Sequence, residues 1–462
     1  MGRHSRLSLA RQIVTSTRSI TFEQLPAEVV EKVKICFMDF LSAACESLDL
    51  PWSGQALGIA GRGQGSAAII GSRARVPAGD AAFVNGILGH GLVREDMHTG
   101  SVSHLGVVVF PTLMALASET PASGRDFITA AVCGYEVGAQ IGRALMTPEN
   151  VRQYRPTGIC GPPGAAIAAA RLLRLDEDAS VSALAFGANV AAGLNEWPQS
   201  GGDEMFFHVG FAARNAVLSA QLAQAGARCS ETSLDGVAGL FRALHCQDRA
   251  DMVKPFDSGY EILAVFHKAA PACNYAQTAA QAALALSGEL RQRGLGTSGI
   301  ESIRVRSTSA AIAYPGCNHA GPFLKTLQAK MSIHYCVAAT LFRGEIAEAN
   351  YRMLDHPEIN RIAGLTTLEL DSEFTASYPA LQGSEVIITL RDGSTLSRRL
   401  QDLIPATPSE IRARFLRAAE PIFGKEQTQL LDAAIDHLEF EPEAAKLAEL
   451  ASLSRTLAAP RI

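Results

Sequence analysis

The sequence lacks the features that mark several common classes of protein. Its nine cysteines are scattered over 462 residues and form no CxxC pair. An odd count without paired spacing argues against a zinc ribbon or a disulfide framework and favours reduced thiols in the cytoplasm. No apolar run approaches the roughly 20 residues that a membrane span needs. The formal charge is -5, and no basic patch with interleaved aromatic residues is present. We therefore expect a protein that binds neither membrane nor nucleic acid.

Signatures of nucleotide cofactors are also missing. The glycine-rich stretch GRGQGS (61–66) does not fit the GxxxxGK[ST] phosphate loop, and no strand-GxGxxG-helix unit occurs. The chain is expected to work without an organic cofactor.

The N-terminal segment allows two interpretations. Its first 22 residues contain four arginines and no acid, which is typical of a mitochondrial transit peptide. The alternative is an amphipathic first helix, because Leu7, Leu9, Ala10, Ile13 and Val14 share one face. We favour the helix.

Two patterns of apolar residues divide the chain, one typical of helices and one that includes strands. Up to about residue 265 the apolar spacing is helical, and stretches rich in Ala and Gly (129–145, 161–173, 182–194) predict tightly packed central helices. Beyond residue 268, IESIRVRST (300–308) alternates like a half-buried strand, and 384–400 predicts a hairpin turning at Asp392-Gly393.

A helix is expected over 329–345, and helical patterning returns from Pro408. The predicted fold is therefore α+β. A large all-helical domain (1–267 plus 399–462) would carry a smaller α+β domain (268–398), inserted before the C-terminal helices.

The segment GHGLVREDMHTGSVSHLG (89–106) is the first candidate for chemistry. It combines His90, His98 and His104 with the adjacent acids Glu95 and Asp96. Ligating histidines on a helix usually lie four residues apart, whereas these are eight and six apart. We therefore expect no metal and interpret the segment as an acid/base loop.

Several cations and a further histidine could hold an anionic substrate. Arg155 precedes a helix that Pro162 or Pro163 is expected to open, and a helix N-terminus beside an arginine suits a carboxylate. His208 and Lys268 also stand among small or polar residues. Singly, His208 could be a core histidine and Lys268 a solvated lysine, so the hypothesis depends on the set.

The order of five motifs resembles the MmgE/PrpD family along nearly the whole chain. They are VNGILGHGL…ED…SH..VVVFP, PTG..G..GAA.AAARLL, H.GFAARN, HK..PACNYAQ and AK.SI.Y.VAA.L..G. The family includes 2-methylcitrate dehydratase, cis-aconitate decarboxylase and iminodisuccinate epimerase. The resemblance implies a large helical domain, a smaller α+β lid, a homodimer, and a site between domain and lid that needs no metal or organic cofactor.

The resemblance also implies roles for individual residues. The family's acidic loop falls on Glu95 and Asp96, its histidine before the VVVFP-like segment on His104, and its lysine on Lys268. We expect His104 to be the principal acid/base, oriented by Asp96, with Lys268 and Arg155 on the substrate carboxylates.

Other positions depart from the family pattern. Arg155 stands where a histidine is usual, Met205 where a lysine is common, Val93 where the first aspartate of the acidic loop is expected, and Cys273 where a histidine often follows the lysine motif. His98 is expected to be a second proton donor, and His208 and Cys273 to line the site.

The sequence thus predicts a lyase that moves a proton at carbon next to a carboxylate of a small di- or tricarboxylate, either as a dehydratase or as a decarboxylase. An epimerase of the iminodisuccinate type remains an alternative, as does a binding protein without activity, since customary polar positions are lost.

Overall fold

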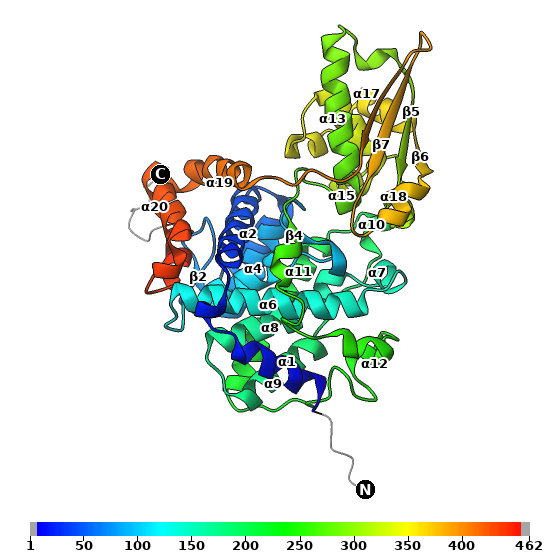
Figure 1. Ribbon diagram of the computed structural model, residues 1–462. Helices are drawn as coiled ribbons and strands as arrows, with labels where there is room; N and C mark the ends of the chain where they lie inside the picture. Colours follow the sequence, from blue (N-terminus) through cyan, green and yellow to red (C-terminus); the bar gives the residue numbers. More distant parts are fainter. Residues whose placement is uncertain (1–6, 454–462) are drawn as a thin grey trace.

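The computed structural model describes residues 7–453, and a body of packed helices holds most of them (Figure 1). Its main helices are α1 (Leu9–Ser19), α2 (Ala27–Glu46), α3 (Pro51–Ala60), α4 (Ala78–His90), α5 (Gly106–Ala117), α6 (Gly124–Leu145), α8 (Pro156–Leu172), α9 (Glu177–Asn189) and α11 (Glu204–Gln224).

Helix α1 confirms the amphipathic helix expected near the N-terminus. It buries Leu9, Ala10, Ile13 and Val14, whereas Leu7 precedes the helix and is exposed. The part of that prediction on residues 1–6 lies outside the described residues.

The small-residue segments form the closely packed centre of the body, as predicted. A Cβ atom added at Gly164 of α8 would lie 2.7 Å from the carbonyl oxygen of Gly134 on α6. Real Cβ atoms do not approach so closely, so a glycine is required at this crossing.

Helix α8 begins earlier than the sequence predicted. It starts at Pro156 and contains Pro162 and Pro163. Pro162 has no N–H to offer the carbonyl of Gly158, but the backbone N–H of Ala192 donates to that carbonyl at 3.1 Å. This replacement bond satisfies the carbonyl, so the helix can continue through Pro162. Since the helix starts at Pro156, Arg155 is the residue that immediately precedes it.

A four-stranded sheet stands to one side of the helical body (Figure 1). Its strand order is β6-β5-β7-β8, with β5 at Ile300–Ser307, β6 at Thr366–Leu370, β7 at Ser384–Leu390 and β8 at Thr395–Leu400. Strands β7 and β8 form the antiparallel hairpin expected around Asp392-Gly393, and Gly393 has the positive φ that the turn needs.

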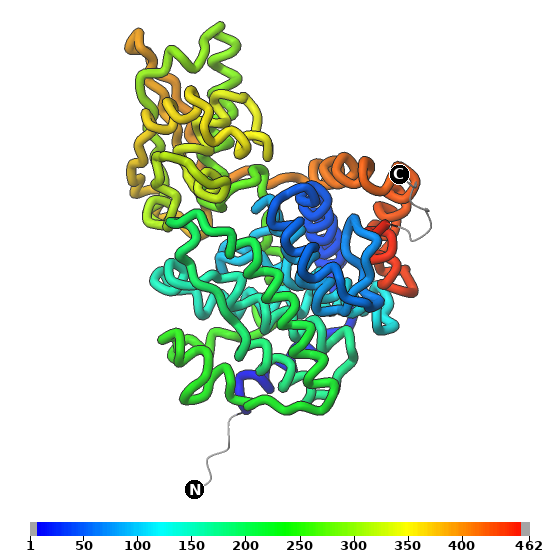
Figure 2. Tube along the Cα trace, turned by 180° about the vertical axis from the view of Figure 1, so that it is seen from behind, coloured from blue at the N-terminus to red at the C-terminus, as the bar shows by residue number. Residues whose placement is uncertain are grey.

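Helices cover this sheet and then lead back to the body. Helix α13 (Gln277–Gln292) packs on β7 and β8, and α16 (Ile333–Arg343) packs against α13. After β8 the chain returns to lay α19 (Pro408–Phe423) along α2, and α20 (Lys425–Asp436) and α21 (Ala445–Leu450) follow (Figures 1 and 2).

The protein is thus mainly helical α+β, as predicted. Its division into domains 1–267 plus 399–462 and 268–398 stays a prediction. Among the described helices, none combines the length and the apolar composition that crossing a membrane would require.

Candidate active site

A short antiparallel pairing brings two distant segments together. Strand β3 (Met97–His98) in the loop after α4 pairs with β4 (Val265–Phe266). Lys268 lies two residues after the end of β4, so the pairing places it beside the acidic loop. Its ammonium Nζ donates to the backbone carbonyl of Val93 at 2.6 Å, which joins the two segments.

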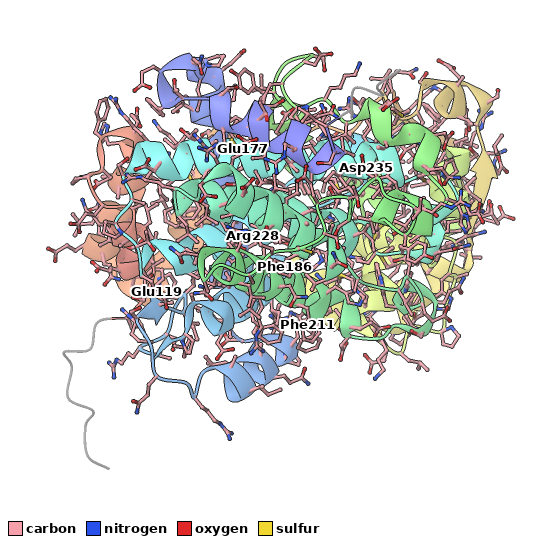
Figure 3. All side chains as sticks on the ribbon, turned by 90° about the horizontal axis from the view of Figure 1, so that it is seen from below. Glu119, Glu177, Phe186, Phe211, Arg228 and Asp235 are labelled. Carbon is pink, nitrogen blue, oxygen red and sulfur yellow. The ribbon has the colours of Figure 1, made fainter. Side chains whose placement is uncertain are left out.

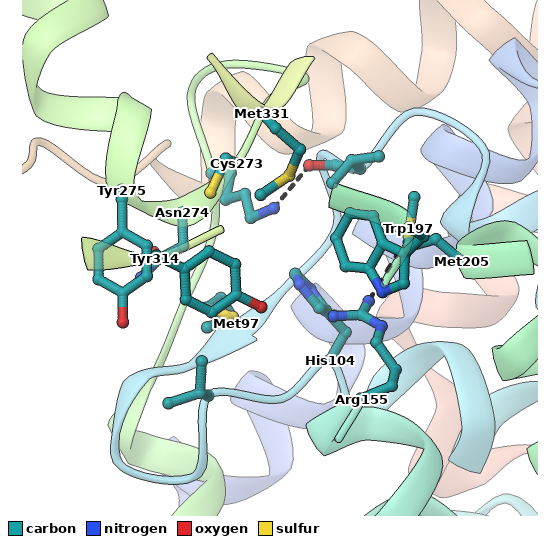
Figure 4. A pocket seen from close by; sticks show the side chains of 13 residues that line it. Met97, His104, Arg155, Trp197, Met205, Cys273, Asn274, Tyr275, Tyr314 and Met331 are labelled. Carbon is teal, nitrogen blue, oxygen red and sulfur yellow. Dashed lines mark hydrogen bonds between the residues drawn. The ribbon is translucent and has the colours of Figure 1, made fainter. Parts of the chain in front are cut away.

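A buried pocket lies at this junction. His104, Arg155 and Lys268 line it together with apolar side chains and with residues 273–275 (Figure 4). All three polar side chains are less than one-tenth exposed. The structure thus brings together three of the residues that the sequence singled out.

His104 is held in one tautomer. Its Nδ1 donates to the backbone carbonyl of Asp96 at 2.9 Å and lies 3.1 Å from Glu95 Oε1. Both are acceptors, so Nδ1 carries the proton and Nε2 keeps a free lone pair. Burial and the nearby charge of Lys268 hold the pKa of His104 well below its usual value. At neutral pH this histidine is a neutral base.

Glu95 and His90 form a second buried pair behind His104. The imidazole Nδ1 of His90 donates to Glu95, and Arg155 Nη2 donates to His90 Nε2 at 2.8 Å. Burial alone would raise the pKa of Glu95, but His90 and Lys268 bring it below its usual value. Glu95 is therefore the ionised carboxylate of the site.

This arrangement corrects the role expected for Asp96. Its carboxylate accepts a hydrogen bond from the Tyr135 hydroxyl, and only its backbone carbonyl reaches His104. Burial raises the pKa of Asp96 to about 6. The carboxylate that orients His104 is its neighbour Glu95.

His98 is also placed differently from the prediction. Its Nδ1 accepts from the backbone N–H of Ser101 at 3.1 Å, and its Nε2 donates to Glu261 at 3.0 Å. These contacts hold it outside the pocket, away from the position that a second proton donor would take. Strand β3 explains the difference, because successive residues point to opposite faces and Met97 is the one that lines the pocket.

His208 lies outside the pocket as well. It lines a separate surface hollow beside Phe211 and Asn215. Burial, Arg155 and His90 lower its pKa to about 4. Cys273, by contrast, does line the pocket, where its Sγ lies 3.7 Å from Sγ of Cys317.

The two cations of the pocket have no acidic partner among the described residues. Lys268 is fully buried, and its Nζ donates only to the carbonyls of Val93 and Ala272. Burial lowers the pKa of Lys268 to about 8. Arg155 contacts His90 instead of a carboxylate, and a guanidinium stays protonated in proteins. Among the described residues, Glu95 is a carboxylate whose charge acts on both cations from a distance, so about one positive charge stays unbalanced. Burying an unbalanced charge is costly, which indicates that a ligand supplies the counter-charge.

Two N–H donors at the same place lack acceptors. Arg155 Nε and Trp197 Nε1 are buried and without a partner in the part of the chain that the structure describes, and the Arg155 guanidinium lies 5.3 Å from the centre of the Trp197 ring. Buried donors without acceptors are rare. A bound carboxylate would satisfy both.

The sequence did not reveal the roles of some site residues, because those roles depend on the fold. His90 was visible in the glycine-flanked segment, but its contact with Glu95 depends on the fold of the loop. Trp197 and Tyr314 also line the pocket. They belong to no motif whose spacing points to chemistry, so only the three-dimensional structure could find them.

His90, Glu95 and His104 could in principle hold a metal ion. One ligand atom from each lies within 4.8 Å of the others, although their sequence spacing matches no metal signature. Two positive side chains argue against the fit. Arg155 already donates to His90, and Lys268 lies close enough to lower the pKa of both histidines. Metal independence stays a prediction.

Comparison with known proteins places the chain among its relatives. The MmgE/PrpD N-terminal domain matches residues 11–252 and the MmgE/PrpD C-terminal domain matches residues 270–439. A cis-aconitate decarboxylase-like protein of Aspergillus oryzae is 26% identical, covering 93% of this chain and 94% of the relative. A cis-aconitate decarboxylase of Aspergillus terreus is 25% identical, covering 87% of each. A 2-methylcitrate dehydratase of Cupriavidus necator is 29% identical over 37% of this chain and 38% of its own length. The chain belongs to the MmgE/PrpD family.

Proposed function

We propose that this member of the MmgE/PrpD family is a cofactor-independent lyase of dehydratase or decarboxylase type, acting on a small di- or tricarboxylate. One observation carries the proposal. Two buried cations without acidic partners, Arg155 and Lys268, line the same pocket as the neutral base His104.

The substrate carboxylates would bind first to these cations. Arg155 offers Nε and its remaining guanidinium N–H groups, and Trp197 Nε1 adds a donor beside it. A second carboxylate would accept from the free N–H of Lys268. Carboxylates held in this way fix the carbon between them relative to His104.

Proton transfer would follow at the carbon next to a carboxylate. His104 Nε2 takes the proton, and the electron pair left on carbon spreads onto the adjacent carboxylate, whose growing charge Lys268 stabilises. Glu95 stabilises the imidazolium that forms on His104. In a dehydration, the electron pair then expels the β-hydroxide, which leaves as water after gaining a proton.

Tyr314 is the proposed donor of that proton. Its hydroxyl lines the pocket and accepts from Asn195 Nδ2 at 3.2 Å. Burial raises the pKa of Tyr314 to about 12, so the phenol is protonated at neutral pH. For a decarboxylation, the same group would protonate the carbon that loses CO₂.

An epimerase of the iminodisuccinate type is the second candidate. It needs two proton-handling groups, and His104 and Tyr314 come to the pocket from different parts of the chain. A non-catalytic binding protein is the third, since Met205 stands where the resemblance to the family leads us to expect a lysine.

Solvent exchange distinguishes the three candidates. The protein is incubated in D₂O with a panel of di- and tricarboxylates, and the products are analysed by mass spectrometry. A new unsaturated acid, or loss of CO₂, supports the lyase. Deuterium gained without a new product supports the epimerase and contradicts the lyase. A melting temperature raised by a carboxylate that is neither exchanged nor converted leaves only binding.

A further inference from the structure

We propose that the site takes a dicarboxylate carrying a small apolar substituent, and that it discriminates against tricarboxylates. This inference rests on the proposed function and narrows its substrate class. It is carried by the charges that line the pocket and by the apolar side chains beside them, here called the apolar wall: Met205, Met97, Met331 and Val102.

The charges of the pocket match two carboxylates. Arg155 and Lys268 are the two lining cations among the described residues, and each lacks an acidic partner. The histidines are neutral, because burial and nearby cations lower their pKa values. Glu95 adds one negative charge behind the pocket, so the site with two bound carboxylates already carries a net charge of about -1 from these groups. A third carboxylate would enter without a cation to balance it.

An apolar wall occupies the space next to Arg155. Met205 is completely buried, and its Sδ lies 2.8 Å from His90 Nε2 and 3.7 Å from Arg155 Nη2. Met97, Met331 and Val102 continue this lining around the pocket (Figure 4). Thioether and alkyl groups cannot solvate a carboxylate, whereas they suit a methyl or similar group.

The polar groups on the opposite side are already engaged. Asn274 donates its amide to Gln382 at 2.8 Å, and the hydroxyl of Tyr275 is 3.1 Å from that of Tyr378. Neither brings a positive charge. A third carboxylate therefore finds no counter-charge on this side either.

Three probes with the same cis-butenedioate core test the inference. Maleate, citraconate and cis-aconitate carry hydrogen, methyl and carboxymethyl at the same carbon, so they differ only in the group that would meet the apolar wall. Calorimetry at pH 7 should find citraconate binding several-fold more tightly than maleate, since one buried methyl contributes roughly 0.8 kcal/mol. Binding of cis-aconitate should be at least tenfold weaker than that of citraconate.

Met205→Lys supplies the missing counter-charge and should invert the order in favour of cis-aconitate. Met205→Leu, which keeps the wall apolar, should leave the order unchanged. If the melting temperature shows that Met205→Lys does not fold, Val102→Lys adds a cation at a half-buried position of the same lining.

The outcomes separate the inference from the proposed function. Tighter binding of cis-aconitate than of citraconate by the unaltered protein would overturn the inference alone. Absence of binding by all three probes, or unchanged binding in Arg155→Gln, would overturn the proposed function and the inference with it. If cis-aconitate binds more weakly than citraconate but neither lysine variant improves its binding, then Met205 and Val102 are not the residues that exclude the third carboxylate.

Discussion

Replacing His104 with alanine should slow proton transfer strongly while leaving the protein folded. The variant loses the Nε2 lone pair that faces the pocket, and a positioned acid/base is typically worth about 10²–10⁴-fold in rate. This corresponds to roughly 2.7–5.4 kcal/mol of transition-state stabilisation. The value of kcat should fall by this factor while KM changes little, because Arg155 and Lys268 still hold the carboxylates.

The loss of folding stability in His104→Ala should have a much smaller effect than the loss of catalysis. Two Nδ1 contacts are lost, to the Asp96 carbonyl and to Glu95, for about 1–3 kcal/mol. The backbone N–H of His104 keeps its bond to Thr157 Oγ1 at 3.0 Å. In a chain of this length such a loss lowers the melting temperature by only a few degrees.

His98→Ala is the matched control. His98 is another buried histidine of the same loop, and it loses comparable contacts, to Ser101 and Glu261. The melting temperature of His98→Ala should fall by about as much as that of His104→Ala. Its kcat per folded molecule should stay near normal, because His98 does not line the pocket. Thermal melting and turnover are measured on one preparation of each variant. A His104→Ala protein with normal turnover per folded molecule would refute the assignment of the base.

Arg155→Ala should act mainly on KM, raising it by about tenfold or more in steady-state assays, because the guanidinium binds a carboxylate already present in the ground state. With the pKa of Lys268 at about 8, kcat/KM should fall as pH rises through that value and the ammonium loses its charge. Lys268→Arg should move this alkaline limb upward, and a limb that stays in place would assign it to another group. Dialysis against a chelator should leave activity unchanged, and loss that a divalent ion restores would contradict metal independence. The protein is predicted to dimerise through α11, whose Phe211 and Leu218 are 52% and 43% exposed on one face, with Phe211 seen in Figure 3. Leu218→Glu should then sediment as a monomer at micromolar concentration, and an unchanged dimer would place the interface elsewhere.

Local sequence patterns predicted the elements well where neighbours in sequence determine them. The hairpin at Gly393 and strand β5 follow from alternating apolar and polar residues. The helix expected over 329–345 is divided at Ser332 into α15 (Thr326–Met331) and α16, but it ends as expected at Gly344, whose left-handed conformation stops a helix. Strand β6, by contrast, was not predicted. It pairs in parallel with β5, and such pairing joins segments far apart in the chain and leaves little local signal.

The same distinction explains the outcome at the site. The motifs indicated His104, Arg155 and Lys268, which line one pocket, but they could not decide between Glu95 and Asp96. Those two acids are adjacent, and their directions are set by the backbone of the loop, where Val93 has a positive φ of 59°. A valine rarely adopts this conformation, so no pattern of residue types predicted that Asp96 would face Tyr135.

A comparison of two buried lysines indicates why Lys268 in particular is available to a ligand. Lys330 is also fully buried, and its Nζ donates to the carbonyls of Leu92 and Pro271 at 2.9 and 3.1 Å. It also pairs with Glu348, so its charge is neutralised within the protein. Lys268 likewise donates to two carbonyls, but it has no carboxylate partner among the described residues. Carbonyl oxygens satisfy an ammonium's N–H groups without cancelling its charge, so both lysines join the same two segments while only Lys268 keeps a positive potential for the substrate.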